Sequence, residues 1–156
     1  MLLLILSMFK ENEVGLSSPA FASMGDIPTK YTCEGQNINP PLMIGELPSG
    51  TKSLVLIVDD PDADKKVFDH WVVYNIAPTN AIKENSKPGI EGKNGKGEKA
   101  YTGPCPPTGK HHYYFKIYAL DTELKLKDPD KAAVMKAMQD HILASGQVVG
   151  LYQKTK

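Results

Sequence analysis

The chain of 156 residues is long enough for a continuous core, and we treat residues 1–156 as a single domain. Its 18 basic and 18 acidic residues give a formal net charge of zero at pH 7. This balance disfavours a nucleic-acid-binding protein, because phosphate backbones bind basic surfaces. All of the basic residues are lysine, so an anion must be held by histidine, lysine, hydroxyl or backbone N–H groups rather than by guanidinium.

Residues 2–9 (LLLILSMF) form an apolar run near the N-terminus. The triplet AFA at 20–22 resembles a signal-peptide cleavage site, but no basic residue precedes the run and a polar stretch follows it at once. The run is also too short to span a bilayer. For the N-terminal extension, residues 1–16, we therefore predict an ordered strand, buried or covered by a partner, and no integral membrane segment.

Four apolar segments predict strands, and the 13 glycines and 12 prolines predict the turns between them. The segments are residues 53–59 (SLVLIVD), 70–77 (HWVVYNIA), 112–120 (HYYFKIYAL) and 147–153 (QVVGLYQ). In the third segment, alternate residues from Tyr113 onward should lie on one face. The connection 79–110 is long for so small a domain, so we expect it to be functional or to carry short strands.

A helix is predicted over about residues 128–145. Asp128 suits the N-cap, and Pro129 suits the first helical position. A buried stripe recurs every four residues, and Gly146 supplies a C-terminal stop; the stripe consists of Val134, Met138 and Ile142.

The chain has two cysteines, Cys33 and Cys105. We expect two reduced thiols in a cytoplasmic protein, following the usual compartment rule. The alternative is a disulfide that closes a long loop, in a secreted or periplasmic protein, since sequence alone cannot place the two sulfurs.

Polar side chains collect where the predicted strands end. Residues 59–64 (DDPDAD) follow the first strand, His70 opens the second, and residues 103–111 (GPCPPTGKH) lead into the third. Loops at one end of a β scaffold are where binding residues usually collect.

Three stretches, DDPDAD, HWVVYNIAP and YTGPCPPTGKHHYYFKIYALD, resemble the signature regions of the phosphatidylethanolamine-binding protein family. That family includes Raf kinase inhibitor protein and the plant flowering-time regulators. The likeness is closest to the bacterial and archaeal branch, where a loop like residues 31–42 also occurs, and it covers about residues 17–152. Each stretch alone is moderately specific, and three in the same order are a strong signal.

The resemblance implies a mainly β fold, in which a large antiparallel sheet packs with a smaller sheet, and a C-terminal helix. It also implies one shallow pocket for phosphate, phospholipid head groups or similar anions, with no cofactor and no metal. Carried over by motif, the ligand-binding residues are Asp60, His70, Gly103, Cys105, Pro106, His111 and Tyr113.

The chain departs from the family pattern at three positions. Asp64 stands where proline is usual, and we expect its charge to weaken the binding of dianions. His112 replaces an arginine, which alters support behind the loop, and Phe68 replaces a tryptophan.

The residue types themselves suit an anion site. Two imidazoles can donate N–H groups to one anion, and a carboxylate can set a tautomer and raise a histidine's basicity. His111 and His112 point to opposite faces of a strand, so only one can join, and Tyr113 shares the face of His111. We expect other polar residues to be strand caps or solvated loop surface, namely His112, His141, Lys83, Lys87, Lys93, Lys96 and Lys99.

These observations favour a binding or regulatory module, monomeric or homodimeric, that recognises a small anion, a lipid head group or a phosphorylated or acidic protein segment. A kinase or protease partner follows from family analogy alone. We expect no enzymatic activity. The alternative is a hydrolase that uses Cys105 as a thiol nucleophile or the cluster of Asp60, Asp62, His70 and His111. Neither an H-E-x-x-H nor a G-x-S-x-G motif is present.

Overall fold

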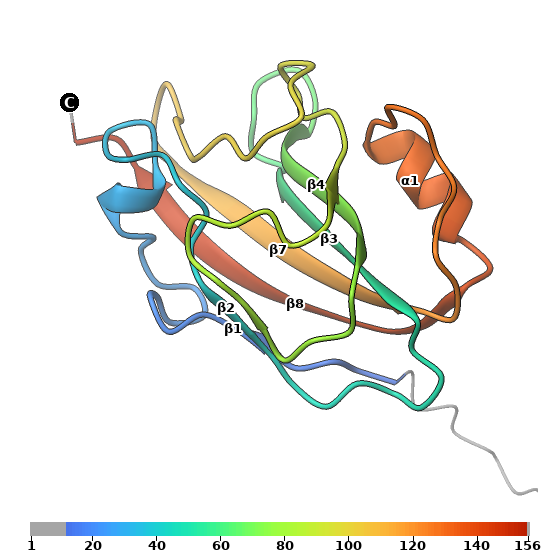
Figure 1. The fold of residues 1–156 in the computed structure, drawn as a ribbon. Coiled ribbons are helices and arrows are strands. Elements are labelled where there is room, and N and C mark those ends of the chain that lie inside the picture. The colour runs from blue at the N-terminus through green and yellow to red at the C-terminus, as the bar shows by residue number, and fades with distance from the viewer. Residues whose placement is uncertain (1–11, 156) are drawn as a thin grey trace, which may run out of the picture.

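The computed structural model describes residues 12–155, which form two antiparallel sheets and a single α-helix (Figure 1). The large sheet has the order β6 (Ile90–Glu91), β4 (Phe68–Ile76), β3 (Ser53–Asp60), β7 (Lys110–Leu120) and β8 (Ile142–Gln153). The small sheet has the order β1 (Leu16–Ser17), β2 (Leu42–Ile44) and β5 (Ala81–Ile82). A short 3₁₀ helix, η1, spans Thr29–Tyr31, and α1 spans Lys131–Met138. The predicted fold class is confirmed.

The large sheet is covered on both faces, which explains the continuous apolar run of its central strand. All eight residues of β3 are buried. Leu54 and Leu56 pack into the main core together with Ile44 and other residues of the small sheet. Val55 lies in a second core with residues of α1. A strand buried on both faces reads as an unbroken hydrophobic segment rather than an alternating one.

β7 shows the predicted alternation. Four of its buried side chains, at alternate positions, belong to the main core: Tyr113, Phe115, Ile117 and Ala119. The fifth, Leu120 at the end of the strand, lies in the second core. The strand pairs with β3 on one side and with β8 on the other. One face of β7 therefore contributes to the core that lies under the candidate site.

The predicted helix over 128–145 is wrong in its bounds. The helix begins after Asp130, whose carboxylate accepts a hydrogen bond from the Ala133 N–H at 2.9 Å. Ile142 belongs to β8 and is 41% exposed, and Gly146 lies within that strand. β8 pairs with β7 from Leu120↔Ile142 to Lys110↔Gln153. The backbone hydrogen bonds to the edge of β7 therefore outweigh the helical spacing at which Ile142 follows Met138.

The N-terminal prediction is tested only in part. Residues 2–9, on which it rested, lie outside the described residues. Glu13 bridges to Ser145 of β8, and Leu16 pairs with Ile44. The long connection 79–110 carries the short strands β5 and β6, as expected.

The two cysteines form a disulfide, which corrects the expectation of reduced thiols. Cys33 and Cys105 are bonded with their Cα atoms 5.5 Å apart, a normal separation for such a bond. The two loops meet only in the folded chain, so the sequence could not reveal the pairing. The cytoplasmic assignment rested on reduced thiols and loses that support. Within residues 12–155, no helix combines the length and the hydrophobicity needed to cross a membrane.

Candidate anion-binding pocket

A cavity of about 260 Å³ lies where the end of β3 meets the starts of β4 and β7. In the antiparallel sheet Asp60 pairs with Phe68, and Asp59 pairs with Tyr114. The last residues of the central strand are therefore flanked by the first residues of both neighbours. All seven predicted site residues line this cavity: Asp60, His70, Gly103, Cys105, Pro106, His111 and Tyr113.

His111 is held by a buried carboxylate. Its Nδ1 lies 2.7 Å from Oδ2 of Asp60, a residue only 3% exposed. The other oxygen of Asp60 accepts the backbone N–H of Asp62 at 2.8 Å, which fixes the carboxylate in the turn. A carboxylate accepts, so Nδ1 carries the proton and Nε2 is the nitrogen available to a ligand.

His70 is held by a backbone carbonyl instead. Its Nδ1 donates to the Thr102 carbonyl at 2.7 Å, and the Thr102 N–H donates to the His70 carbonyl at 3.0 Å. Burial lowers the pKa of His70, and the hydrogen bond to Thr102 and the charge of Asp60 oppose this effect without cancelling it. His70 is therefore neutral at pH 7, with Nε2 as a hydrogen-bond acceptor until it takes up a proton.

Tyr113 lies beside both histidines. Its ring packs edge-on against His70, with centroids 5.2 Å apart, and lies 6.5 Å from the ring of His111. The Tyr113 hydroxyl is buried and has no hydrogen-bond partner among the described residues. Burial raises its pKa, followed in importance by the negative charge of Asp60, so the hydroxyl keeps its proton. A buried donor without an acceptor, in the lining of a cavity, points to an acceptor on a ligand.

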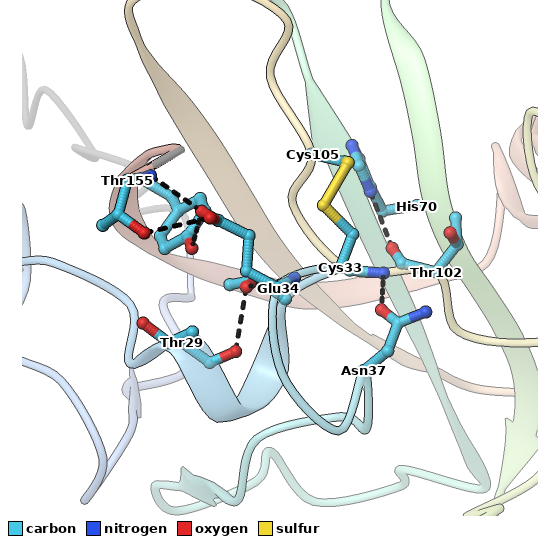
Figure 2. The surroundings of a disulfide bond; sticks show 11 residues. Thr29, Cys33, Glu34, Asn37, His70, Thr102, Cys105 and Thr155 are labelled. Carbon is cyan, nitrogen blue, oxygen red and sulfur yellow. Dashed lines mark hydrogen bonds between the residues drawn. A yellow bond between two sulfur atoms is a disulfide. The ribbon is translucent and has the colours of Figure 1, made fainter.

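The wall opposite the sheet is built from two loops that are tied together (Figure 2). Besides the Cys33–Cys105 disulfide, the Cys33 N–H donates to the Pro104 carbonyl at 3.1 Å. The Gly103 N–H donates to the Asn37 side chain at 2.7 Å. A Cβ at Gly103 would lie 2.3 Å from the Tyr31 carbonyl, so only glycine allows this approach. The wall is thus largely formed before any ligand binds.

A family model described as phosphatidylethanolamine-binding protein matches residues 17–153. The chain belongs to this family. Among curated relatives, a UPF0098 protein of Methanothermobacter thermautotrophicus is 43% identical over 150 residues, which cover 90% of this chain and 99% of that protein.

Two solved structures support the family fold. A phosphatidylethanolamine-binding protein homologue of Chlamydia trachomatis is similar with a TM-score of 0.88 and 40% identity, over 92% of this chain and 99% of that one. Escherichia coli YbcL, described as a member of the mammalian family, is similar with a TM-score of 0.83 and 28% identity, over the same shares.

Within this family member, the polar residues expected outside the site are placed as follows. His112 pairs with Asp62 at 2.7 Å on the exposed side of β7, and His141 pairs with Asp121 at 2.8 Å. Lys96 is exposed in its loop, as expected, and it also lines the pocket. Asp64 and Phe68, noted as departures from the family pattern, line it too.

Sequence reasoning missed other lining residues, and they come mainly from loops. Asn37 and Thr102 hold the loops and His70 through the hydrogen bonds described above. Their role depends on contacts between distant segments, for which the sequence carries no local signal. Among residues 12–155, no group of three or more His, Cys, Asp or Glu side chains is placed to hold a metal ion.

Proposed function

We propose that this protein is a binding module whose pocket holds a small oxyanion, such as the phosphate of a lipid head group or of a phosphorylated side chain. The observation that carries the proposal is the pair formed by His111 and Asp60, which leaves Nε2 for a ligand. The Tyr113 hydroxyl in the same lining has no hydrogen-bond partner among residues 12–155. A cationic imidazole and a neutral hydroxyl are both donors suited to an anion.

The dimensions and walls of the pocket limit the size of the ligand that it can bind. A volume of about 260 Å³ fits a phosphate with a short substituent rather than acyl chains. Prolines and a disulfide in the wall reduce the loop ordering that binding would otherwise require. The same proposal covers a kinase or protease partner that the protein modulates through this pocket. Such a partner would either present the anionic group to the pocket or compete with a bound anion.

The test is titration calorimetry with dimethyl phosphate, which carries one negative charge throughout pH 6–8. Any pH dependence then belongs to the protein. Binding should strengthen as the pH falls from 8 toward 6, because protonated imidazole attracts the anion more strongly. Replacing His111 by alanine should weaken binding at pH 6 about tenfold or more, because it removes the Nε2 group that faces the ligand.

His112→Ala is the matched control, because His112 lies next in the chain but pairs with Asp62 outside the pocket. It should leave affinity at pH 6 within about twofold of the wild type. A flat pH profile, or a larger loss from His112→Ala than from His111→Ala, would contradict the proposed site.

A hydrolase remains the second candidate, because an imidazole oriented by a carboxylate can also act as a general base. The disulfide contradicts a thiol nucleophile at Cys105 in this form of the protein. The discriminating measurement is turnover of p-nitrophenyl phosphate and p-nitrophenyl acetate. More than one product per protein molecule, abolished by His111→Ala, would favour the enzyme over the binding module.

A further inference from the structure

Among residues 12–155, Lys96 is the only lysine in the lining of the pocket, and it comes from the loop between β6 and β7. Other lysines of the region have acidic partners: Lys99 pairs with Asp128, and Lys110 pairs with Asp26. Within residues 12–155, no acidic side chain lies within ion-pair distance of Lys96. Its ammonium group is therefore available to a ligand at the mouth of the pocket.

The turn that carries Lys96 is held by a buried side chain. Asn94 is 6% exposed, and its Oδ1 accepts the backbone N–H groups of Lys96 at 2.8 Å and Glu98 at 3.1 Å. Its Nδ2 donates to the Ala100 carbonyl at 2.8 Å. The backbone at Lys96 is thus fixed, and only the side chain needs to be ordered on binding.

The same turn packs directly on β4, where Phe68 lines the pocket. Gly95 donates its N–H to the Asp69 carbonyl at 2.8 Å. A Cβ at Gly95 would lie 2.5 Å from the ring of Phe68, so the turn rests on this ring. Phe68 in turn packs edge-on against His70, with centroids 4.8 Å apart. The position of Lys96 is therefore coupled through Phe68 to the position of His70.

The charges of the pocket explain what Lys96 adds. Asp60 balances a protonated His111, His70 is neutral at pH 7, and Asp64 at the mouth repels anions. A lysine keeps its positive charge throughout the pH range in which histidines titrate. Since Coulomb attraction scales with the ligand's charge, one ammonium stabilises a dianion twice as much as a monoanion.

We propose that Lys96 is a ligand-binding residue that offsets Asp64 and selects a doubly charged phosphomonoester over a singly charged anion. This inference rests on the proposed function of the pocket and names the ligand class within it. The same chemistry is offered by a free phosphomonoester head group and by a phosphorylated side chain, whereas a phosphodiester is singly charged.

The experiment is titration calorimetry at pH 8 and low ionic strength, which limits screening. The probes are methyl phosphate, mainly a dianion at this pH, and dimethyl phosphate, a monoanion. Lys96→Gln should weaken the binding of methyl phosphate about tenfold and the binding of dimethyl phosphate about threefold. The factor is squared because the lost interaction free energy doubles when the charge of the ligand doubles. Lys93→Gln is the matched control, because it removes a charge from the same loop outside the pocket lining, and both affinities should stay within about twofold.

Each outcome separates the two proposals. If Lys96→Gln and Lys93→Gln change the two affinities alike, or if Lys96→Gln weakens the binding of both probes equally, Lys96 does not select for the charge of the ligand. If His111→Ala abolishes binding while Lys96→Gln has no effect, the pocket stands and only this inference fails. If the wild type binds neither probe at pH 6 or pH 8, the proposed function fails, and the inference fails with it.

Discussion

His70 shows how burial and hydrogen bonding act in opposite directions on one residue. Its side chain is 5% exposed, which disfavours the charged form, while the Thr102 carbonyl and nearby carboxylates favour it. The carboxylates that act on it are Asp60, Asp69 and Asp59. Burial dominates, so the pKa of His70 in the folded protein lies below the value of about 6.5 found in an unfolded chain.

This pKa difference predicts acid sensitivity. On acidification the unfolded chain takes up the proton first, so the contribution of His70 is fully present above about pH 6.5 and is lost as the pH falls through the folded pKa. Each unit of lowering is worth about 1.4 kcal/mol. Between pH 7 and pH 5, the free energy of unfolding should fall more in the wild type than in His70→Asn, whose amide cannot take up a proton in this range.

Urea unfolding at both pH values measures the two slopes. The comparison of slopes removes the constant cost of the substitution and the shared titration of carboxylates. Equal slopes in the two proteins would mean that His70 titrates in the folded state as it does in the unfolded state.

At the scale of elements, β8 is held on its outer edge by the N-terminal segment. The Val14 N–H donates to the Ser145 carbonyl at 2.9 Å, and the Ser145 N–H donates to the Asn12 carbonyl at 3.2 Å. Gly146 sits against this segment, and a Cβ there would lie 1.7 Å from the Val14 carbonyl oxygen. The glycine is therefore required by the close approach of two backbones rather than by a helix end.

Gly146→Ala should lower the free energy of unfolding by about 2–3 kcal/mol, because the clash is with backbone and requires the segment to move. Gly15→Ala is the control at the same segment, since its Cβ would meet its nearest neighbour at an ordinary 3.8 Å. It should change stability by less than about 1 kcal/mol. Urea unfolding of both variants checks this, and equal losses would argue against the close contact at Gly146.

At the scale of the whole molecule, the disulfide connects parts of the chain separated by 72 residues. It joins the loop after η1 to the loop before β7 and so encloses β2 to β6 in one covalent ring. Closing a loop of that length restricts the unfolded chain, and loop-entropy estimates give about 4 kcal/mol. The bond should therefore stabilise the entire fold as well as the pocket wall.

The double substitution Cys33→Ser with Cys105→Ser should lower the free energy of unfolding by about 2–5 kcal/mol. Wild-type protein measured with reductant should behave like the variant, and reductant should not affect the variant itself. Thiol counting under denaturing conditions provides the direct check. Two reactive thiols in protein purified without reductant would contradict the bond.

Local sequence patterns were enough to predict most of the large sheet, and the family resemblance supplied the seven residues that line the pocket. Apolar β-branched runs, alternation in 112–120 and three family motifs are local features, and strand ends bring their neighbours together in an antiparallel sheet. The strand predicted over 53–59 spans Ser53–Asp60 in the structure, and the strand predicted over 112–120 spans Lys110–Leu120. The choice of His111 over His112 rested on the family motif and was supported by strand periodicity.

Contacts between distant segments decided the remainder. Residues 142–145 form strand rather than helix because β7 presents an edge whose backbone groups need partners. The Cys33–Cys105 bond and the place of Lys96 in the pocket depend on how loops meet after folding. Within the described part of the chain, the lack of a hydrogen-bond partner for the Tyr113 hydroxyl likewise follows from what surrounds the side chain in space. Propensity and spacing act over a few residues, whereas these features depend on packing across the whole chain.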